Sequence, residues 1–175
     1  MDFSTLCFEK AAINQAQAIS DLINLTYRGT TGWTTEAEII HGDRTNRQEI
    51  EAAMMNPSGH LFVVNQLSMP AACIYITSEK EHAYIGFFSV HPSLQGQGFG
   101  NYMLEQAEIF ARDFLLAHKF VLFVISQRPE LIAFYQRRGY RGTGRIEVFP
   151  SYLGVPKITG LTIEYLEKSA LLCST

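Results

Sequence analysis

Hydrophobic and polar positions along the chain follow two periods, which predict strands and helices in turn. A short apolar run at residues 3–8 opens the chain. Residues 14–27 then have helical spacing, and Asn14 with Gln17 three positions later is typical of a capping box. One face of this helix should be buried, and it carries Ala16, Ile19 and Ile23.

The next segment, residues 28–45, is rich in Gly and Thr and has no sustained period. It predicts a long, partly structured loop, and such loops in compact domains are often functional. Thr45, followed three residues later by Gln48, predicts the start of a second helix. The Pro-Ser-Gly sequence at 57–59 should end that helix, whose inward positions would be Ile50, Ala53 and Met54.

Three strand-like runs follow at residues 61–65, 71–77 and 83–90. The connectors between them are short, which favours an antiparallel meander. Residues 120–125 are apolar throughout, as expected of a strand buried on both faces. The clearest helix lies at 99–117, between the strand-like runs at 83–90 and 120–125. Its apolar stripe is formed by Met103, Ala107, Phe110, Ala111 and Phe114.

A strand, a helix and a strand in this order predict a parallel crossover over residues 83–125. Pro129 begins a fourth helix and Gly139 ends it. Strands near 140–146 and 161–167 complete the pattern. This alternation, with no linker in it, predicts an α/β (α+β layered) fold and a single domain over residues 1–175.

The composition is that of a globular protein and narrows the possible functions. Of the 175 residues, 47% are hydrophobic and 18% are charged, and 14 basic against 17 acidic residues give a net charge of −3. No broad basic face for nucleic acid is therefore expected. No run approaches the ~18 apolar residues of a membrane span, and the first residues are unlike a signal peptide. We expect no nucleic-acid partner, no membrane partner and a cytoplasmic location.

Cysteines and histidines form no recognisable site. Cys7, Cys73 and Cys173 lie far apart, without zinc-finger spacing, and a reducing compartment fits this usage. Cys73 lies in the apolar run 71–77 and should be a buried thiol. The five histidines make no metal-binding motif, so no metal is expected, and no serine lies in a G-x-S-x-G sequence.

The stretch SVHPSLQGQGFGNYMLEQA at residues 89–107 carries the most chemical information. A strand ends at Val90, and Gly96, Gly98 and Gly100 precede the clearest helix. Glycines allow a positive φ and a close approach to a ligand. The free amides at a helix start bind anions, and a diphosphate is the natural guest.

Three kinds of phosphate loop could explain these glycines. A Walker loop requires a Gly-Lys-Ser/Thr sequence, and this loop has no lysine. A Rossmann fingerprint requires G-x-G-x-x-G near the first strand, whereas the spacing here is G-x-G-x-G, late in the chain. The third kind is Q-x-x-G-x-G after V-x-P, which matches Gln95, Gly98 and Gly100.

With this third pattern the sequence resembles the GNAT superfamily of acetyl-CoA-dependent N-acetyltransferases. The sequence LIAFYQRRGY at 131–140 resembles the second motif of that family, which bears its tyrosine. The resemblance in element order covers roughly residues 3–168. It implies a central mixed, mostly antiparallel sheet of about seven strands flanked by about four helices. It also implies transfer of an acetyl group from acetyl-CoA to a primary amine of a small molecule or peptide.

The resemblance places acetyl-CoA along the glycine loop. Its pyrophosphate would lie on the amides of Gln95, Gly96, Gly98, Gly100 and Asn101, and its pantetheine arm would pair with Phe88 and Val90. One backbone amide of that strand end would also bind the thioester oxygen. The family often has an asparagine seven residues before its tyrosine, where this chain has Arg128. That arginine could reach a phosphate of CoA or cap the following helix.

Tyr135 matches the family's tyrosine that protonates the departing thiolate. A phenol with a pKa of ~10 remains protonated near an alkyl thiol of pKa ~8.5, so it can donate a proton. A purely structural role as a core aromatic is the alternative.

The acceptor pocket should be lined by the loop at 28–45. Glu36 is the candidate for base or amine anchor, Trp33 for an aromatic wall, and Arg28 or Arg44 for binding a carboxylate. Glu36 could instead be a solvated or capping acid, and the arginines could simply lie at the surface.

Two other functions remain open at this point. A noncatalytic acyl-CoA-binding sensor could use the same scaffold, and a nucleotide-binding domain could carry the glycine loop by coincidence. A homodimer could form through residues 147–160 and the apolar C-terminal tail.

Overall fold

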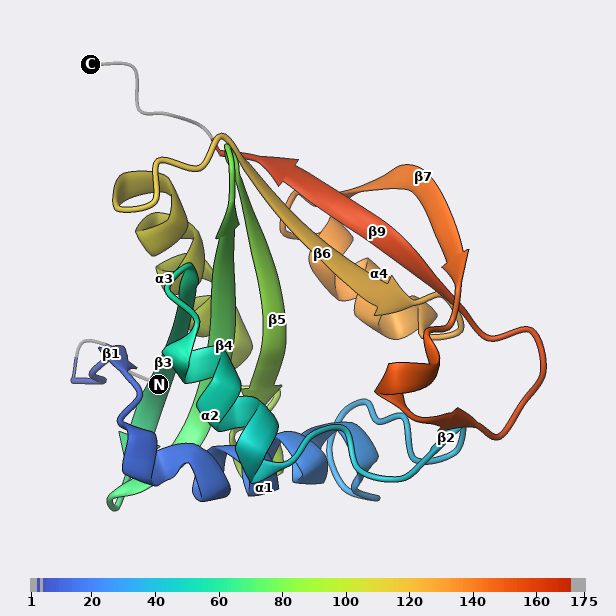
Figure 1. The fold of residues 1–175 in the computed structure, drawn as a ribbon, viewed down its shortest axis with the longest axis horizontal. Helices are drawn as coiled ribbons and strands as arrows, with labels where there is room; N and C mark the ends of the chain where they lie inside the picture. The colour runs from blue at the N-terminus through green and yellow to red at the C-terminus, as the bar shows by residue number, and fades with distance from the viewer. Residues whose placement is uncertain (1–2, 4, 171–175) are drawn as a thin grey trace.

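The computed structural model describes residue 3 and residues 5–170, which form one seven-stranded sheet with helices on both faces (Figure 1). The strand order is β1-β3-β4-β5-β6-β9-β7, and only β5 and β6 are parallel neighbours. This confirms the predicted mixed, mostly antiparallel sheet with four flanking α-helices. The strands are β1 (Glu9–Lys10), β3 (Gly59–Gln66), β4 (Met69–Glu79), β5 (His82–Val90), β6 (Lys119–Ile125), β7 (Arg141–Val148) and β9 (Thr162–Ser169).

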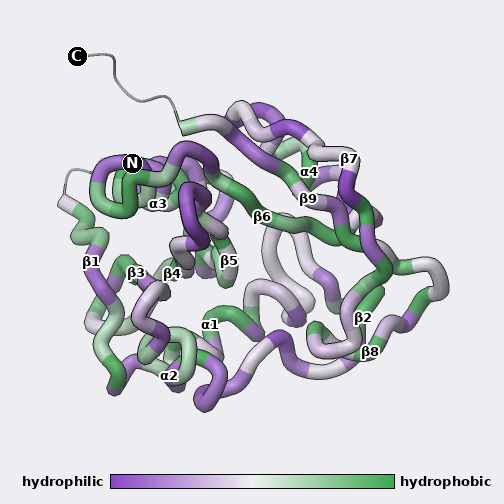
Figure 2. The backbone as a smooth tube through the Cα atoms, turned by 45° about the horizontal axis from the view of Figure 1, so that its top comes forward, coloured by the Kyte–Doolittle hydropathy of each residue, from purple (hydrophilic) through white to green (hydrophobic). Residues whose placement is uncertain are grey.

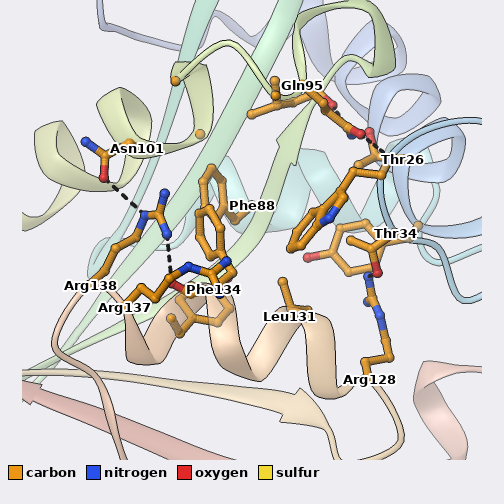
Figure 3. A pocket seen from close by; sticks show the side chains of 17 residues that line it. Thr26, Thr34, Phe88, Gln95, Asn101, Arg128, Leu131, Phe134, Arg137 and Arg138 are labelled. Carbon is orange, nitrogen blue, oxygen red and sulfur yellow. Dashed lines mark hydrogen bonds between the residues drawn. The ribbon is translucent and has the colours of Figure 1, made fainter.

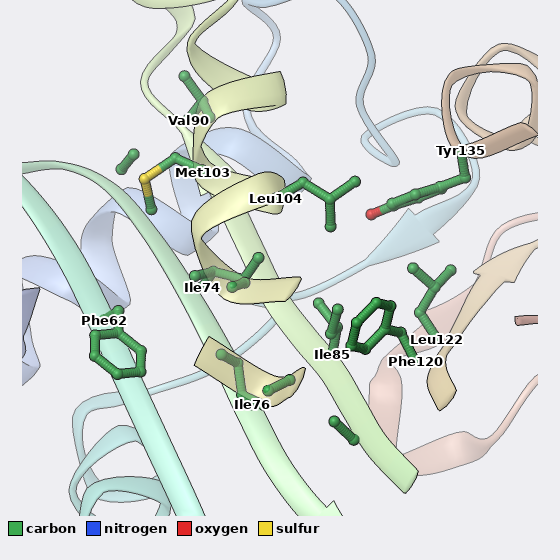
Figure 4. Packing of buried hydrophobic residues seen from close by; sticks show 14 of the residues in the cluster. Phe62, Ile74, Ile76, Ile85, Val90, Met103, Leu104, Phe120, Leu122 and Tyr135 are labelled. Atoms are coloured by element: carbon green, nitrogen blue, oxygen red, sulfur yellow. The ribbon is translucent and has the colours of Figure 1, made fainter. Parts of the chain in front are cut away.

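Side-chain alternation along β3 divides the core between the two faces. Leu61 and Val63 pack with α1 and α2, whereas Phe62 and Val64 pack with α3 and α4 (Figure 4). Ala16, Ile19 and Ile23 are fully buried in the first cluster, as predicted. The helices are α1 (Ala16–Arg28), α2 (Arg47–Met55), α3 (Phe99–Asp113) and α4 (Pro129–Gln136).

A second, two-stranded sheet fixes the predicted loop at 28–45. Its strands are β2 (Ile40–His41) and β8 (Val155–Pro156). Ile40 packs there with Phe149 and Leu153, so the loop is attached to the C-terminal part of the chain. Short 3-10 turns lie at η1 (Ile13–Gln15), η2 (Pro92–Leu94) and η3 (Ser151–Leu153).

The N-terminal caps of α1 and α2 differ from the predicted caps by a small shift along the sequence. At α1, Asn14 lies in a 3-10 turn, and the Gln15 side chain accepts a hydrogen bond from the Ala12 amide at 2.9 Å. At α2, the cap is Asn46 rather than Thr45, because the Asn46 carboxamide accepts from the Glu49 amide at 3.0 Å.

Three further expectations were wrong in detail. The run at 3–8 forms no strand over its described residues, although Phe3, Leu6 and Phe8 pack on the core. The third helix ends at Asp113, so Phe114 lies beyond its last turn and is 74% exposed. Strand β6 is buried on one face only, since Val121 and Phe123 are half-buried between its buried positions. Its hydrophobic run stands out in the middle of the sheet (Figure 2).

Cys73 is fully buried, as predicted, and burial raises the pKa of its thiol to about 12. Cys7 is exposed, and Cys173 lies outside the described residues, as does most of the predicted dimer-forming tail. Residues 147–160 expose Val148, Tyr152 and Val155, and the dimer predicted there stays a prediction. Over residues 5–170, no helix combines the length and apolar character that a membrane span requires.

Candidate active site

The site lies where β5 and β6 separate. The two strands pair only at one end, through His82–Tyr84 and Lys119–Val121. Beyond Tyr84 they diverge (Figure 1), so the edge of β5 that faces β6 has open backbone groups. A pocket of about 330 Å³ lies beside this opening, between the end of β5, the glycine loop and α4 (Figure 3).

A β-bulge shapes the end of β5. Phe87 and Phe88 together oppose Ile74 of β4, because the register shifts between Cys73 and Tyr75. Phe87 has a φ of 45°, in the left-handed region that a bulky residue rarely adopts. The bulge points neighbouring side chains to opposite faces: Phe87 packs with the α1 and α2 cluster, and Phe88 packs with the α3 and α4 cluster.

The glycine loop presents unpaired amides to the pocket. Gly96 has a φ of 73° and Gly98 has a φ of 87°, and Gly98 caps α3 without a side-chain hydrogen bond. Among the described residues, no hydrogen-bond acceptor faces the amides of Gly96, Gln97 and Gly98. The first amides of α3 add to them, so the loop can bind an anion such as a diphosphate.

Alanine at Gly98 should destabilise the fold by about 1 kcal/mol, because a Cβ disfavours the left-handed conformation. The free energy of unfolding from a urea titration measures this loss. Gly142→Ala is the matched control, since Gly142 lies in β7 with open space around it and no positive φ. Equal stability of the two variants would contradict the strained geometry of the loop.

Gln95 connects the glycine loop to the loop that follows α1. Its Nε2 donates to the Val90 carbonyl at 2.9 Å, and its Oε1 accepts from the Trp33 amide at 2.5 Å. Trp33 is half exposed, and its ring lies 5.7 Å from that of Phe134. The structure therefore places Trp33, predicted as an aromatic wall of the acceptor pocket, beside the glycine loop in the wall of the larger cavity.

Tyr135 lies at the meeting point of two cavities. A second, smaller cavity of about 50 Å³ lies between the diverging strands. Both cavities are lined by Tyr27, Phe88, Arg128, Leu131 and Tyr135. The Tyr135 ring reaches from α4 toward Leu104 of α3 (Figure 4). Burial raises the pKa of its phenol above the ordinary value. Among the described residues, its hydroxyl has no hydrogen-bond partner.

Glu36 is buried in an ion-pair cluster rather than solvated. One carboxylate oxygen accepts from Arg128 at 2.9 Å, and the other accepts from Arg28. Arg28 also donates to the Leu153 carbonyl at 2.5 Å, and Arg128 donates to the Thr34 hydroxyl at 2.8 Å (Figure 3). The cluster thus joins the loop at 28–45 to the start of α4.

The structure gathers most of the predicted site residues. Trp33 and Tyr135 line the larger cavity, and Glu36 lines the smaller one. The larger cavity is also lined by all eight residues predicted to bind acetyl-CoA: Phe88, Val90, Gln95, Gly96, Gly98, Gly100, Asn101 and Arg128. Arg28 is different, because it lines neither cavity and its side chain is committed to Glu36 and Leu153. The guanidinium of Arg128 binds Glu36 and Thr34, not the helix end as a cap.

Sequence reasoning missed two arginines of the site. Arg137 and Arg138 follow α4 and line the larger cavity, where Arg138 lies 3.5 Å above the Phe134 ring and donates to Asn101 at 3.1 Å (Figure 3). Their position inside the tyrosine motif at 131–140 was the available signal. Arg44, which the sequence offered with Arg28 for binding a carboxylate, lines the smaller cavity.

No group of three or more metal-ligating side chains occurs within the part of the chain that the structure describes.

Comparisons with known proteins agree with this geometry. The sequence model of the acetyltransferase (GNAT) family matches residues 17–140. A search of curated protein sequences found no significant match.

Solved structures share the fold at low sequence identity. Mutant forms of the spermidine/spermine N-acetyltransferase from Vibrio cholerae align with a TM-score of 0.68 and 15% identity, over 95% of both chains. The ribosomal-protein-S18-alanine N-acetyltransferase from Escherichia coli aligns with a TM-score of 0.71 and 14% identity, over 96% of both chains.

Proposed function

The chain belongs to the GNAT acetyltransferase family, and from this premise we propose that it transfers an acetyl group from acetyl-CoA to a primary amine. One observation carries the proposal: two neighbouring cavities, one beside the strand divergence and one within it, share Tyr135 in their walls. A donor in the larger cavity and an acceptor in the smaller one would meet at that residue.

Several features of the larger cavity support acetyl-CoA as its ligand. The free amides of the glycine loop suit the pyrophosphate, and Arg137 and Arg138 add positive charge beside them. The unpaired edge of β5 after Tyr84 offers backbone donors and acceptors to the amides of a pantetheine arm.

Acetyl transfer proceeds by direct attack, with no covalent enzyme intermediate. The amine nitrogen bonds to the thioester carbonyl carbon, the C–S bond breaks, and the electron pair leaves on sulfur. Tyr135 donates its phenolic proton to that sulfur. Burial keeps the phenol protonated, because it raises the pKa of Tyr135.

Glu36 serves to position Arg128 rather than to accept the proton of the amine. Both of its oxygens already accept hydrogen bonds from guanidinium groups. A proton on either oxygen would displace one of these bonds and leave a buried arginine unpaired. Water therefore takes the proton from the acceptor amine, and a proton returned from water to the Tyr135 phenolate restores the enzyme.

Release of CoA from acetyl-CoA, measured over a panel of amines, amino acids, peptides and drugs, tests the proposal. The expected result is turnover with at least one primary amine. Binding of acetyl-CoA without turnover on any acceptor would instead favour the noncatalytic sensor. Binding of ATP or NAD without binding of CoA would overturn the assignment of the glycine loop.

A further inference from the structure

The wall of the smaller cavity contains an arginine whose charge no described residue neutralises. Arg44 lines this cavity, and its guanidinium lies 4.9 Å from the centre of the Phe87 ring and 5.6 Å from that of Tyr27. Among residues 5–170, no carboxylate forms a salt bridge with it and no acceptor bonds its guanidinium. A half-buried guanidinium with all its N–H groups free is well suited to bind an anion.

The position of Arg44 is fixed before any ligand arrives. The Asn24 carboxamide of α1 accepts from the Arg44 amide at 2.8 Å and from the Thr45 amide at 3.1 Å. It also donates to the Thr45 carbonyl at 2.9 Å. The two aromatic rings add cation–π contacts. Such a preorganised side chain loses little conformational freedom when it binds a ligand.

The surrounding charges also favour an anion. Arg44 and Arg128 line the smaller cavity with one buried carboxylate, Glu36, which is also paired with Arg28 behind the wall, and Glu130 lies 3.7 Å from Arg128. Burial lowers the pKa of Arg28; the paired Glu36 opposes this shift, and the charges of Arg44 and Arg128 add to it. The excess of positive charge lies on the acceptor side of Tyr135, where a polycation would be repelled.

We infer that the acceptor is an amine that also carries a carboxylate, as in an amino acid, and that Arg44 binds this carboxylate. The inference rests on the proposed acetyl transfer. Because Arg44 and Tyr135 line the same small cavity, the amine and the carboxylate lie close together in the acceptor. This chemistry separates the chain from its structural neighbours that are named for spermidine.

The test compares amino acids with their carboxamides, and with spermidine, as acceptors in the CoA-release assay. The carboxamide keeps the amine and the side chain but removes the negative charge. Its amine is also less basic, so a preference for the acid cannot come from amine protonation. We expect kcat/KM to be at least tenfold higher for the acids, through a lower KM.

Arg44→Met should remove this preference by raising the KM for the acids about 10- to 100-fold, the usual loss for a hydrogen bond to a charged group. The KM for the carboxamides and the kcat should change little. Arg44→Lys should restore part of the preference. Arg47→Met is the matched control, because Arg47 is exposed, pairs with Glu51 on α2 and lines neither cavity.

Several results would overturn the inference while leaving acetyl transfer intact. These are equal use of acids and carboxamides, a preference for spermidine, or a preference for acids that survives in Arg44→Met. If no amine is acetylated, the proposed function fails. Calorimetric titration of amino acids and their carboxamides into the CoA-bound protein then still decides whether Arg44 selects the carboxylate. Equal affinities there would overturn it.

Discussion

Phenylalanine at position 135 is expected to lower kcat by about 10²- to 10⁴-fold, the usual contribution of a general acid. The Kd for acetyl-CoA should stay nearly unchanged, because the ring that lines both cavities is retained. Steady-state release of CoA gives the first quantity, and calorimetric titration gives the second.

Tyr140→Phe is the matched control for this result. It removes a buried hydroxyl from the same sequence motif, yet Tyr140 lines neither cavity. The alkaline limb of the pH profile offers a second check. Burial raises the pKa of Tyr135, so kcat should not fall as the pH passes ~10, where a free phenol loses its proton. Unchanged kcat in Tyr135→Phe would leave this residue a core aromatic only.

The substitution Glu36→Ala is expected to lower the free energy of unfolding by about 3–5 kcal/mol. The substitution removes the carboxylate that Arg28 and Arg128 share. Both guanidinium groups would then stay buried without it, because each side chain is only 7% exposed. The midpoint and slope of a urea titration measure the effect.

Glu38→Ala removes the same charge from the same loop, at an exposed position, and should change stability by less than about 0.5 kcal/mol. A Glu36→Ala variant as stable as Glu38→Ala would show that the cluster contributes nothing to the fold. Loss of activity without loss of stability would return Glu36 to the role of base.

Local sequence signals predicted the residues that line the larger cavity. The glycine loop could be read directly, because its backbone geometry depends on Gly96 and Gly98 themselves. Strand β5 and helix α3 flank the loop in the sequence as well as in space. The motif around Tyr135 likewise fixed the position of α4 beside it.

The acceptor side depends on pairings between distant parts of the chain. Glu36 and Arg128 are 92 positions apart, so no periodicity could show that the acid is buried. The bulge at Phe87 arises from the register of β5 against β4, which a single strand does not reveal. Arg44 was already a candidate for binding a carboxylate, but only the structure shows its ring contacts and its lack of a described carboxylate partner, which distinguish it from Arg28.

The separation of β5 from β6 also has a mechanical consequence. Beyond the three residue pairs that join β5 to β6, no ladder hydrogen bonds connect these two strands, so the sheet is divided into two parts there. A molecule that pairs with the open edge of β5 acts as a temporary strand and stiffens the junction. The protein is then most rigid while it holds its substrates and most easily deformed when products must leave, so slow amide exchange along residues 85–90 should report occupancy directly.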